Sequence, residues 1–498
     1  SSESSVVYRG PPAGLPADHA RHLGAQALGI EIDWRHRFVP PGTRAAETPG
    51  VIYLDVGGGL GAGIIDHHGD GARPSSTAEL ILQHRELVYV HLLGPALERA
   101  AAGEDLSGAK ITLTLVTHFN PDFDGVVSSY LVRQLIETGD VPVAAPSLAR
   151  YVTEVDQGRY ELRLGRRETF FAPHIAQLAI QNLPSQGTPH ERSLAGLMRG
   201  LMLVEGVLQD LQGLRGPSAF HPDHEDHPAT HWSKRPEFED VRALLDEEPE
   251  RFADDYEAAR RTEVSLPARG TGRLGVSQLA EVRVPTFISP EPPRSKLNKY
   301  WVRASGFPYY ICPYPTEADR ESPRLWGRVI LSLDPTWSDE HGVAPSLRGL
   351  GFALERRECE VRAVDGDERP PSPRWDDGTC DNGDPWYDGR GHDFTIIDAP
   401  ATCTHLEYDD VLAIACGGRF WHVPLASGTV TLMWTADLDE AGDAASVLKG
   451  AWSPMKCPVG IDDRLAPFYE SCRAPPSAEE KLASPAVVAR REARDFPP

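Results

Sequence analysis

The sequence lacks the marks of several large protein classes. It has no run of about 18 apolar residues and no charged leader followed by an apolar segment, so neither a membrane span nor a signal peptide is predicted. Positive charge is scarce, because 50 Lys and Arg oppose 73 Asp and Glu and leave a net charge of −23. A protein that coats nucleic acid needs a positive surface, which excludes that class. We expect a cytoplasmic protein with no membrane partner.

Cysteine is also scarce. The seven cysteines all lie in the C-terminal half, and none forms a Cys-x-x-Cys pair. This usage favours reduced, mostly buried thiols over a disulfide framework or a zinc site.

The chain is 498 residues long, and a chain of this length is predicted to form two or three domains. Residues 1–215 are predicted to form an α/β domain around a mostly parallel, doubly wound sheet. Residues 216–265 are predicted to be a linker rich in His, Pro and acid that contains a helix. Residues 266–455 are predicted to form an α+β domain, and residues 456–498 a tail.

The linker contains four closely spaced histidines, which are His221, His224, His227 and His231. Such spacing is compatible with a metal site. Pro222 and Pro228 interrupt any regular element that could present these ligands, which favours a solvated linker.

The N-terminal half contains several short apolar stretches that predict strands and helices. Residues 51–56, 62–65 and 111–116 read as strands, and residues 127–138 and 193–214 read as helices. A further strand is predicted at 141–143. In the C-terminal half, strands are predicted at 326–333, 394–398 and 420–425.

Acidic and imidazole side chains accompany three of these strands. They are Asp55 in the first, Asp66, His67 and His68 after the second, and His118, Asp122 and Asp124 after the third. The carboxyl ends of parallel strands meet at one edge of a sheet, so these groups should converge. Carboxylates with a few imidazoles suit Mn²⁺ or Mg²⁺, and two such cations would remove the repulsion among the carboxylates.

The same residues resemble a known family, the DHH phosphoesterase superfamily. Its first motif has the form His-x-x-Pro-Asp-x-Asp-Gly-x-x-Ser, which residues 118–128 match at every defined position. Its name-giving motif is present at residues 66–68. The surroundings of Asp55 and residues 75–78 look most like the metal-dependent hydrolase branch with RNA exonuclease members. The motif order departs from the family, because the motif that comes first there comes third here.

The resemblance implies a role for each matched residue. His118 and Asp122 would hold one metal ion, and Asp124, His67 and Asp156 the other. Asp55 would bridge the two ions. His68 would contact the scissile phosphate, and Asp66 would orient a neighbouring histidine.

A polar loop in the C-terminal half offers candidate substrate contacts. Trp386 could stack on a base, while Arg390 and His392 could pair with a phosphate. The alternative is a tightly turned structural loop.

These observations predict a two-metal, Mn²⁺-dependent phosphodiesterase of nuclease or exonuclease type, with Mg²⁺ as a second candidate cation. Its substrate would be a nucleotide or a short nucleic acid. The alternatives are a phosphoanhydride hydrolase such as a pyrophosphatase, or a regulatory protein that binds a nucleotide without catalysis. The sequence leaves open whether the chain pairs with itself or with another protein.

Overall fold

The protein is described by a computed structural model. It describes residues 23–68, 75–159, 187–211, 220, 228, 231, 234–270, 280–314, 327–337, 343–347, 350–364, 366–367, 385–387, 389, 395–400, 403–417, 419–425 and 428–435. The chain divides into two compact units, Ser1–Glu248 and Pro249–Pro498. The fold is mixed α/β, and each unit has its own main sheet.

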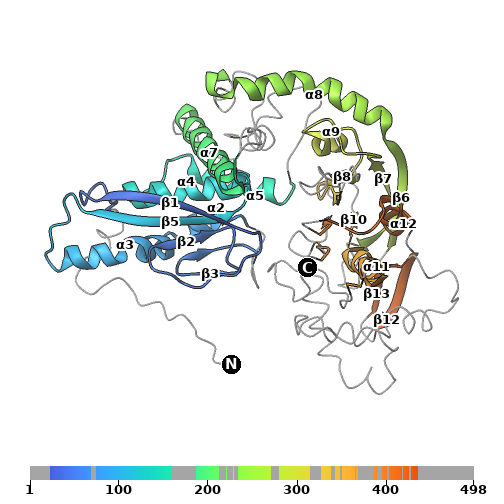
Figure 1. Ribbon diagram of the computed structural model, residues 1–498, viewed down its shortest axis with the longest axis horizontal. Helices are drawn as coiled ribbons and strands as arrows, with labels where there is room; N and C mark the ends of the chain where they lie inside the picture. The colour runs from blue at the N-terminus through green and yellow to red at the C-terminus, as the bar shows by residue number, and fades with distance from the viewer. Residues whose placement is uncertain are drawn as a thin grey trace, which may run out of the picture. The chain divides into compact units, whose positions relative to one another are not determined.

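Unit 1 contains a five-stranded sheet in the order β1-β5-β2-β4-β3 (Figure 1). Its strands are β1 (Glu31–Val39), β2 (Val51–Leu54), β3 (Leu60–Gly61), β4 (Ile64–Ile65) and β5 (Lys110–His118). Neighbouring strands from β1 to β4 run parallel, and β3 is antiparallel to β4. The sheet is therefore mostly parallel, and the predicted strands near 51–56, 62–65 and 111–116 are confirmed.

The helices of unit 1 follow the apolar periodicity of the sequence. They are α2 (Thr77–Gln83), α3 (Arg85–Ala101), α4 (Phe123–Thr138), α5 (Ala145–Asp156), α7 (Pro189–Leu211) and the 3₁₀ helix η5 (Pro236–Phe238). The next helix, α8 (Glu239–Ala258), begins in unit 1 and ends in unit 2. The predicted helices at 127–138 and 193–214 correspond to α4 and α7. No described helix has the combined length and apolar character needed to span a membrane.

The two faces of the sheet differ along β1. On one face Trp34 donates from Nε1 to Glu137 of α4 at 2.6 Å, and the ring of Phe38 packs on His190 of α7. The other face carries the charged residues Asp33 and Arg35, and the Arg35 side chain is 67% exposed. A doubly wound sheet would bury both faces under helices. The described residues therefore do not show a second helical layer over this face of β1.

The predicted strand at 141–143 is wrong. Residues 141–142 have no regular structure, and residues 143–144 form a turn in which Ala145 N donates to Pro142 O at 2.9 Å, directly before α5. Val143 is 52% exposed, so its side chain contributes little to the core. Three residues with a central proline offer too few ladder donors to form a buried strand.

Unit 2 is built on a six-stranded sheet in the order β10-β6-β7-β8-β9-β11, in which only β7 and β8 pair in parallel. The elements are β6 (Arg260–Gly270), β7 (Ala280–Ile288), α9 (Asn298–Ala304), β8 (Tyr309–Tyr314), β9 (Arg328–Leu333), β10 (Val343–Pro345), α11 (Leu350–Val364), β11 (Ile396–Asp398), α12 (Tyr408–Gly417) and the paired strands β12 (Arg419–Leu425) and β13 (Gly428–Thr435). The strands predicted near 326–333, 394–398 and 420–425 are confirmed by β9, β11 and β12.

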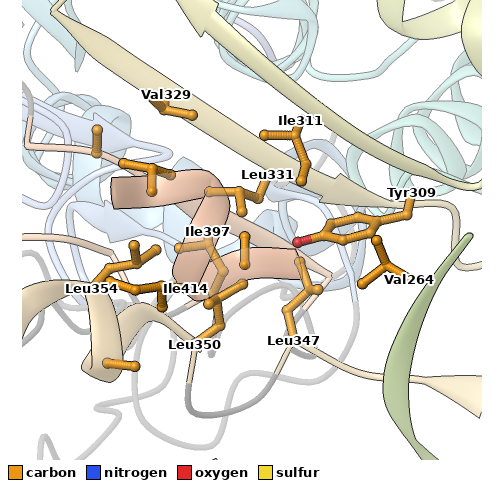
Figure 2. Packing of buried hydrophobic residues seen from close by; sticks show 14 of the residues in the cluster. Val264, Tyr309, Ile311, Val329, Leu331, Leu347, Leu350, Leu354, Ile397 and Ile414 are labelled. Atoms are coloured by element: carbon orange, nitrogen blue, oxygen red, sulfur yellow. The ribbon is translucent and has the colours of Figure 1, made fainter. Parts of the chain in front are cut away.

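The main core of unit 2 lies between its sheet and helices α11 and α12. Figure 2 shows Tyr309 and Leu331 of the sheet facing Leu354 and Ile414 of these helices, and all four side chains are buried. A second cluster includes Tyr310 of β8 with aromatic residues of α8. Consecutive residues of a strand point to opposite faces, so β8 is buried on both sides.

Candidate metal centre

The candidate site lies where β2, β4 and β5 end. Asp55 follows β2 directly and has a φ of 61°, a left-handed conformation that few residues other than glycine adopt. Gly57 completes the turn with a φ of 120°, and a Cβ there would lie 2.6 Å from Ile64 Cγ2. Asp55 lies at the end of β2 at this sheet edge, where the residue is 4% exposed.

Asp55 lies between three imidazoles. Its Oδ1 is 3.0 Å from His67 Nε2 and 3.6 Å from His68 Nδ1. Its Oδ2 is 3.4 Å from His118 Nε2. The two oxygens of this carboxylate therefore face two different sets of side chains.

Two of these histidines direct a ring nitrogen at the Asp55 carboxylate. His67 Nε2 is buried and forms no hydrogen bond, although Asp55 Oδ1 is only 3.0 Å away. The Nδ1 atom of His118 lies 2.8 Å from the carbonyl oxygen of Phe119, to which an Nδ1–H can donate. That hydrogen bond leaves the Nε2 lone pair directed at carboxylate oxygens, as in a metal-ligating histidine oriented by a backbone carbonyl.

His68 is oriented differently, by its neighbour Asp66. His68 Nδ1 is 2.8 Å from Asp66 Oδ1, closer than its 3.6 Å separation from Asp55. Asp66 also accepts the backbone N–H groups of Gly58 and His68, at 2.7 Å and 3.0 Å. The ring nitrogen of His68 nearest Asp55 is thus engaged with Asp66, which leaves Nε2 for another partner.

Asp122 and Asp124 have distinct surroundings although they are two residues apart. Asp122 caps α4 by accepting Gly125 N on Oδ1 at 2.9 Å, and its Oδ2 lies 3.8 Å from His118 Nε2. Asp124 is buried and accepts the N–H groups of Thr77 and Ala78, at 2.7 Å and 2.9 Å. These donors belong to the first turn of α2, which has no partners of its own for them. Asp124 therefore fastens the start of α2 to α4.

This difference gives a stability prediction. We expect Asp124→Ala to lower the free energy of unfolding by about 3 kcal/mol, because two buried N–H groups and the Ser128 hydroxyl lose their shared acceptor. Asp122→Ala removes the same charge but a single capping bond, and should cost about 1 kcal/mol. Urea unfolding of both variants, followed by circular dichroism, measures the difference. Equal losses would show that Asp124 does not hold α2.

Asp156 is the last residue of α5, a position where the helix dipole disfavours negative charge. Its Oδ2 lies 3.6 Å from His67 Nδ1. Burial, together with the nearby carboxylates of Asp55 and Asp122, raises the pKa of Asp156 to about 6. A cation beside His67 would remove the cost of ionising this group.

The surroundings of the site favour positive charge. Burial opposes ionisation of Asp55, but the adjacent imidazoles of His118, His67 and His68 hold the pKa of its carboxyl well below its usual value. Burial also disfavours the charged forms of His67 and His118, yet the adjacent carboxylates raise the pKa of both imidazoles well above its usual value.

Two groups of potential ligand atoms emerge, each with its atoms within 4.8 Å of one another: Asp55, His67 and His68, and Asp55, His118 and Asp122. Their donor atoms are carboxylate oxygens and imidazole nitrogens. Asp124 and Asp156 border these groups without belonging to either. The structure thus brings all eight candidate residues of the N-terminal half to one sheet edge.

The predicted substrate contact of Trp386 is wrong. Its side chain is fully buried in unit 2, where its indole Nε1 donates to Glu358 at 3.1 Å. A buried indole cannot stack on a base, so the alternative of a structural loop holds for this residue. Arg390 and His392 lie outside the described residues. Of the linker histidines, His231 is exposed and the other three also lie outside the described residues.

Sequence reasoning missed Thr77 as part of the site. Its hydroxyl donates to Asp55 Oδ1 at 3.3 Å, and its backbone N–H donates to Asp124. The signal in the sequence was the run of hydroxyl residues at 75–77, which predicts a helix start, and Ser76 is indeed the N-cap of α2. Because the first N–H groups of a helix have no partner within the helix, a helix that starts beside acidic side chains can donate these N–H groups to them.

Comparisons with known proteins add no assignment, because no protein-family model, curated protein or solved structure matches the chain.

Proposed function

We propose that this chain is a two-metal phosphoesterase that hydrolyses phosphodiester bonds of nucleotides or short oligonucleotides. The observation that carries the proposal is the position of Asp55, whose Oδ1 faces His67 and whose Oδ2 faces His118. A carboxylate placed in this way is suited to bridge two cations about 3.5–4 Å apart. The resemblance of residues 66–68 and 118–128 to DHH phosphoesterase motifs supports the same function.

The ligand sets follow from the contacts around Asp55. His118 and Asp122 would hold one cation, and His67 with Asp156 would hold the other. Asp124 Oδ2 accepts a single N–H, and since a carboxylate oxygen has two lone pairs, it retains one for the second cation. Mn²⁺ or Mg²⁺ would be the resident ion.

The chemistry then divides between the cations and the chain. When bound, the cations would lower the pKa of a shared water and neutralise charge on the phosphoryl oxygens. Asp66 fixes the His68 ring through Nδ1, so that protonated His68 can donate from Nε2 to a phosphate oxygen. The pKa of His68 lies above its usual value because hydrogen bonding with Asp66 and the charge of Asp55 outweigh burial and the repulsion of His67.

The proposal predicts a loss of turnover in Asp122→Asn. Asparagine keeps the α4 cap, because it is as good an N-cap as aspartate, but it removes a negative ligand. We expect turnover to fall at least about 100-fold and the Mn²⁺ content to fall from two ions to one. The assay incubates the chain and Mn²⁺ with short RNA, short DNA, cyclic dinucleotides and pyrophosphate, and elemental analysis counts the metal.

The matched control is Asp140→Asn, which neutralises a carboxylate that is 72% exposed and pairs with Arg85, and which should leave both readouts unchanged. Turnover of pyrophosphate alone would replace the proposal with a phosphoanhydride hydrolase. Two bound Mn²⁺ ions without turnover of any substrate would replace it with a nucleotide-binding regulator.

A further inference from the structure

Strand β1 forms one edge of the unit 1 sheet. It is nine residues long and pairs with β5 on one side, and no described strand pairs with its other side. A long unpaired edge is a template for another strand, and proteins usually shorten it, interrupt it with proline or place like charges on it. Residues 31–39 contain no proline, and their charges are of both signs.

The backbone direction shows which residues face the free edge. Glu31 N donates to Ala109 O at 2.8 Å, and Phe119 N donates to Val39 O at 2.9 Å, both within the chain's own sheet. Odd-numbered residues of β1 therefore direct their backbone groups towards β5. Because these directions alternate along a strand, Ile32, Trp34 and His36 direct theirs outwards.

The charges of β1 lie on one face in a self-complementary order. Glu31 and Asp33 come first, and Arg35 and Arg37 follow at the same spacing of two. The side chains of Glu31 and Arg35 are 68% and 67% exposed, and Arg37 is also exposed. An antiparallel strand with the same sequence would place each acid opposite a base.

We propose that β1 pairs antiparallel with β1 of a second copy of this chain, about a twofold axis at Trp34. In this register Trp34 faces Trp34 of the second copy, and their outward backbone groups exchange hydrogen bonds. Asp33 then lies opposite Arg35 of the second copy, and Glu31 opposite Arg37. The two sheets become one continuous sheet across the dimer.

Neighbouring registers are excluded by the same charges. Every register centred on a residue keeps the outward backbone groups opposite one another, because even-numbered residues then face even-numbered residues. The charges therefore decide among these registers, and the centre at Trp34 gives an opposite charge to all four charged residues of β1. A centre at position 33 places two Asp33 carboxylates face to face, and a centre at position 35 does the same for two Arg35 guanidinium groups. Like charges directly opposite on a sheet are destabilising. The Arg35 side chain bonds Asp33 of its own chain at 2.8 Å, but its other N–H donors can reach the second copy.

The test uses two charge-reversed full-length chains, Asp33→Arg and Arg35→Asp. Each alone places like charges at both central pairs of the dimer, so its dissociation constant should rise at least about tenfold. Mixed in equal amounts, they restore opposite charges at both pairs and should form a heterodimer as tight as the wild-type dimer. Sedimentation equilibrium from about 1 to about 200 μM, a range that covers weak interfaces, measures all three. Arg99→Glu, which reverses an exposed charge on α3, is the matched control.

Each outcome bears on the pairing. A wild-type dimer weakened by either single change and restored by the mixture supports it, provided that circular dichroism shows both chains folded. Hydrogen exchange should also show the amides of Trp34 and His36 protected more in the wild-type dimer than in either single variant. A monomeric wild-type chain at every concentration, or a dimer that neither change weakens, would overturn it. None of these results depends on metal binding or turnover.

Discussion

Replacing Asp55 with asparagine is expected to abolish the binding of both cations and to lower phosphodiester turnover at least about 1,000-fold. The reason is geometric, because the Asp55 oxygens face both His67 and His118, and no other described carboxylate does so. Asparagine tolerates the positive φ at this position, and its oxygen can still accept from Thr77. Its amide N–H can donate to an imidazole nitrogen, so the variant should remain folded. Titration calorimetry with Mn²⁺ and the turnover assay check the two effects.

Asp66→Asn provides the contrast for this prediction. It changes an adjacent carboxylate that orients His68 and accepts two backbone N–H groups, so it should lower turnover while both cations still bind. An Asp55→Asn chain that still binds two Mn²⁺ ions would disprove the bridging position. Loss of folding in that chain would be seen by circular dichroism and would separate a structural effect from a loss of ligand.

The second large effect is expected in unit 2, where Glu358 should contribute strongly to stability. Its carboxylate is fully buried on α11 and accepts from Trp386, Thr404, His405 and Arg362. Glu358→Ala removes the acceptor of all four donors at once. We expect a loss of about 4 kcal/mol in the free energy of unfolding, because buried donors without partners pay their full desolvation cost. For a unit of this size the melting temperature should fall by roughly 10 °C.

Calorimetry of Glu358→Ala beside Glu360→Ala tests this role. Glu360 lies on the same helix, but its side chain is 47% exposed and pairs only with arginines of α11, so its loss should change stability by less than about 0.5 kcal/mol. Glu358→Gln keeps one oxygen acceptor and should fall between the two. If Glu358→Ala melts like Glu360→Ala, the network does not stabilise unit 2.

Most of the candidate metal centre could be predicted from the sequence, because the relevant residues follow short apolar strands. Parallel strands place their carboxyl ends together whatever their order in the chain, so Asp55, Asp66 and His118 converge although the motifs are permuted. The sequence could not show that Asp124 holds the start of α2. That role depends on the packing of α2 against α4, and no local pattern encodes such a contact.

The error in the prediction for Trp386 arises from its tertiary context. Trp386 sits in a polar loop, so the sequence suggested exposure, but two glutamates of α11 provide buried acceptors for it. For unit 1, the prediction of a doubly wound sheet implies helices on both faces, and this part stays a prediction. Charged residues at every second position of β1 indicate that one face of this strand is polar.

The position of β5 has a consequence for how the chain acquires its structure. Among the described strands β1 pairs only with β5, and β5 separates β1 from β2. Residues 31–39 therefore have no ladder partner until residues 110–118 have been synthesised. That same segment carries His118, and Asp122, Asp124 and Asp156 follow it in the chain, so neither the full sheet nor the ligand set can form before β5 has been synthesised. A nascent chain that stops before β5 has neither, which ties the maturation of the site to the last step of sheet assembly.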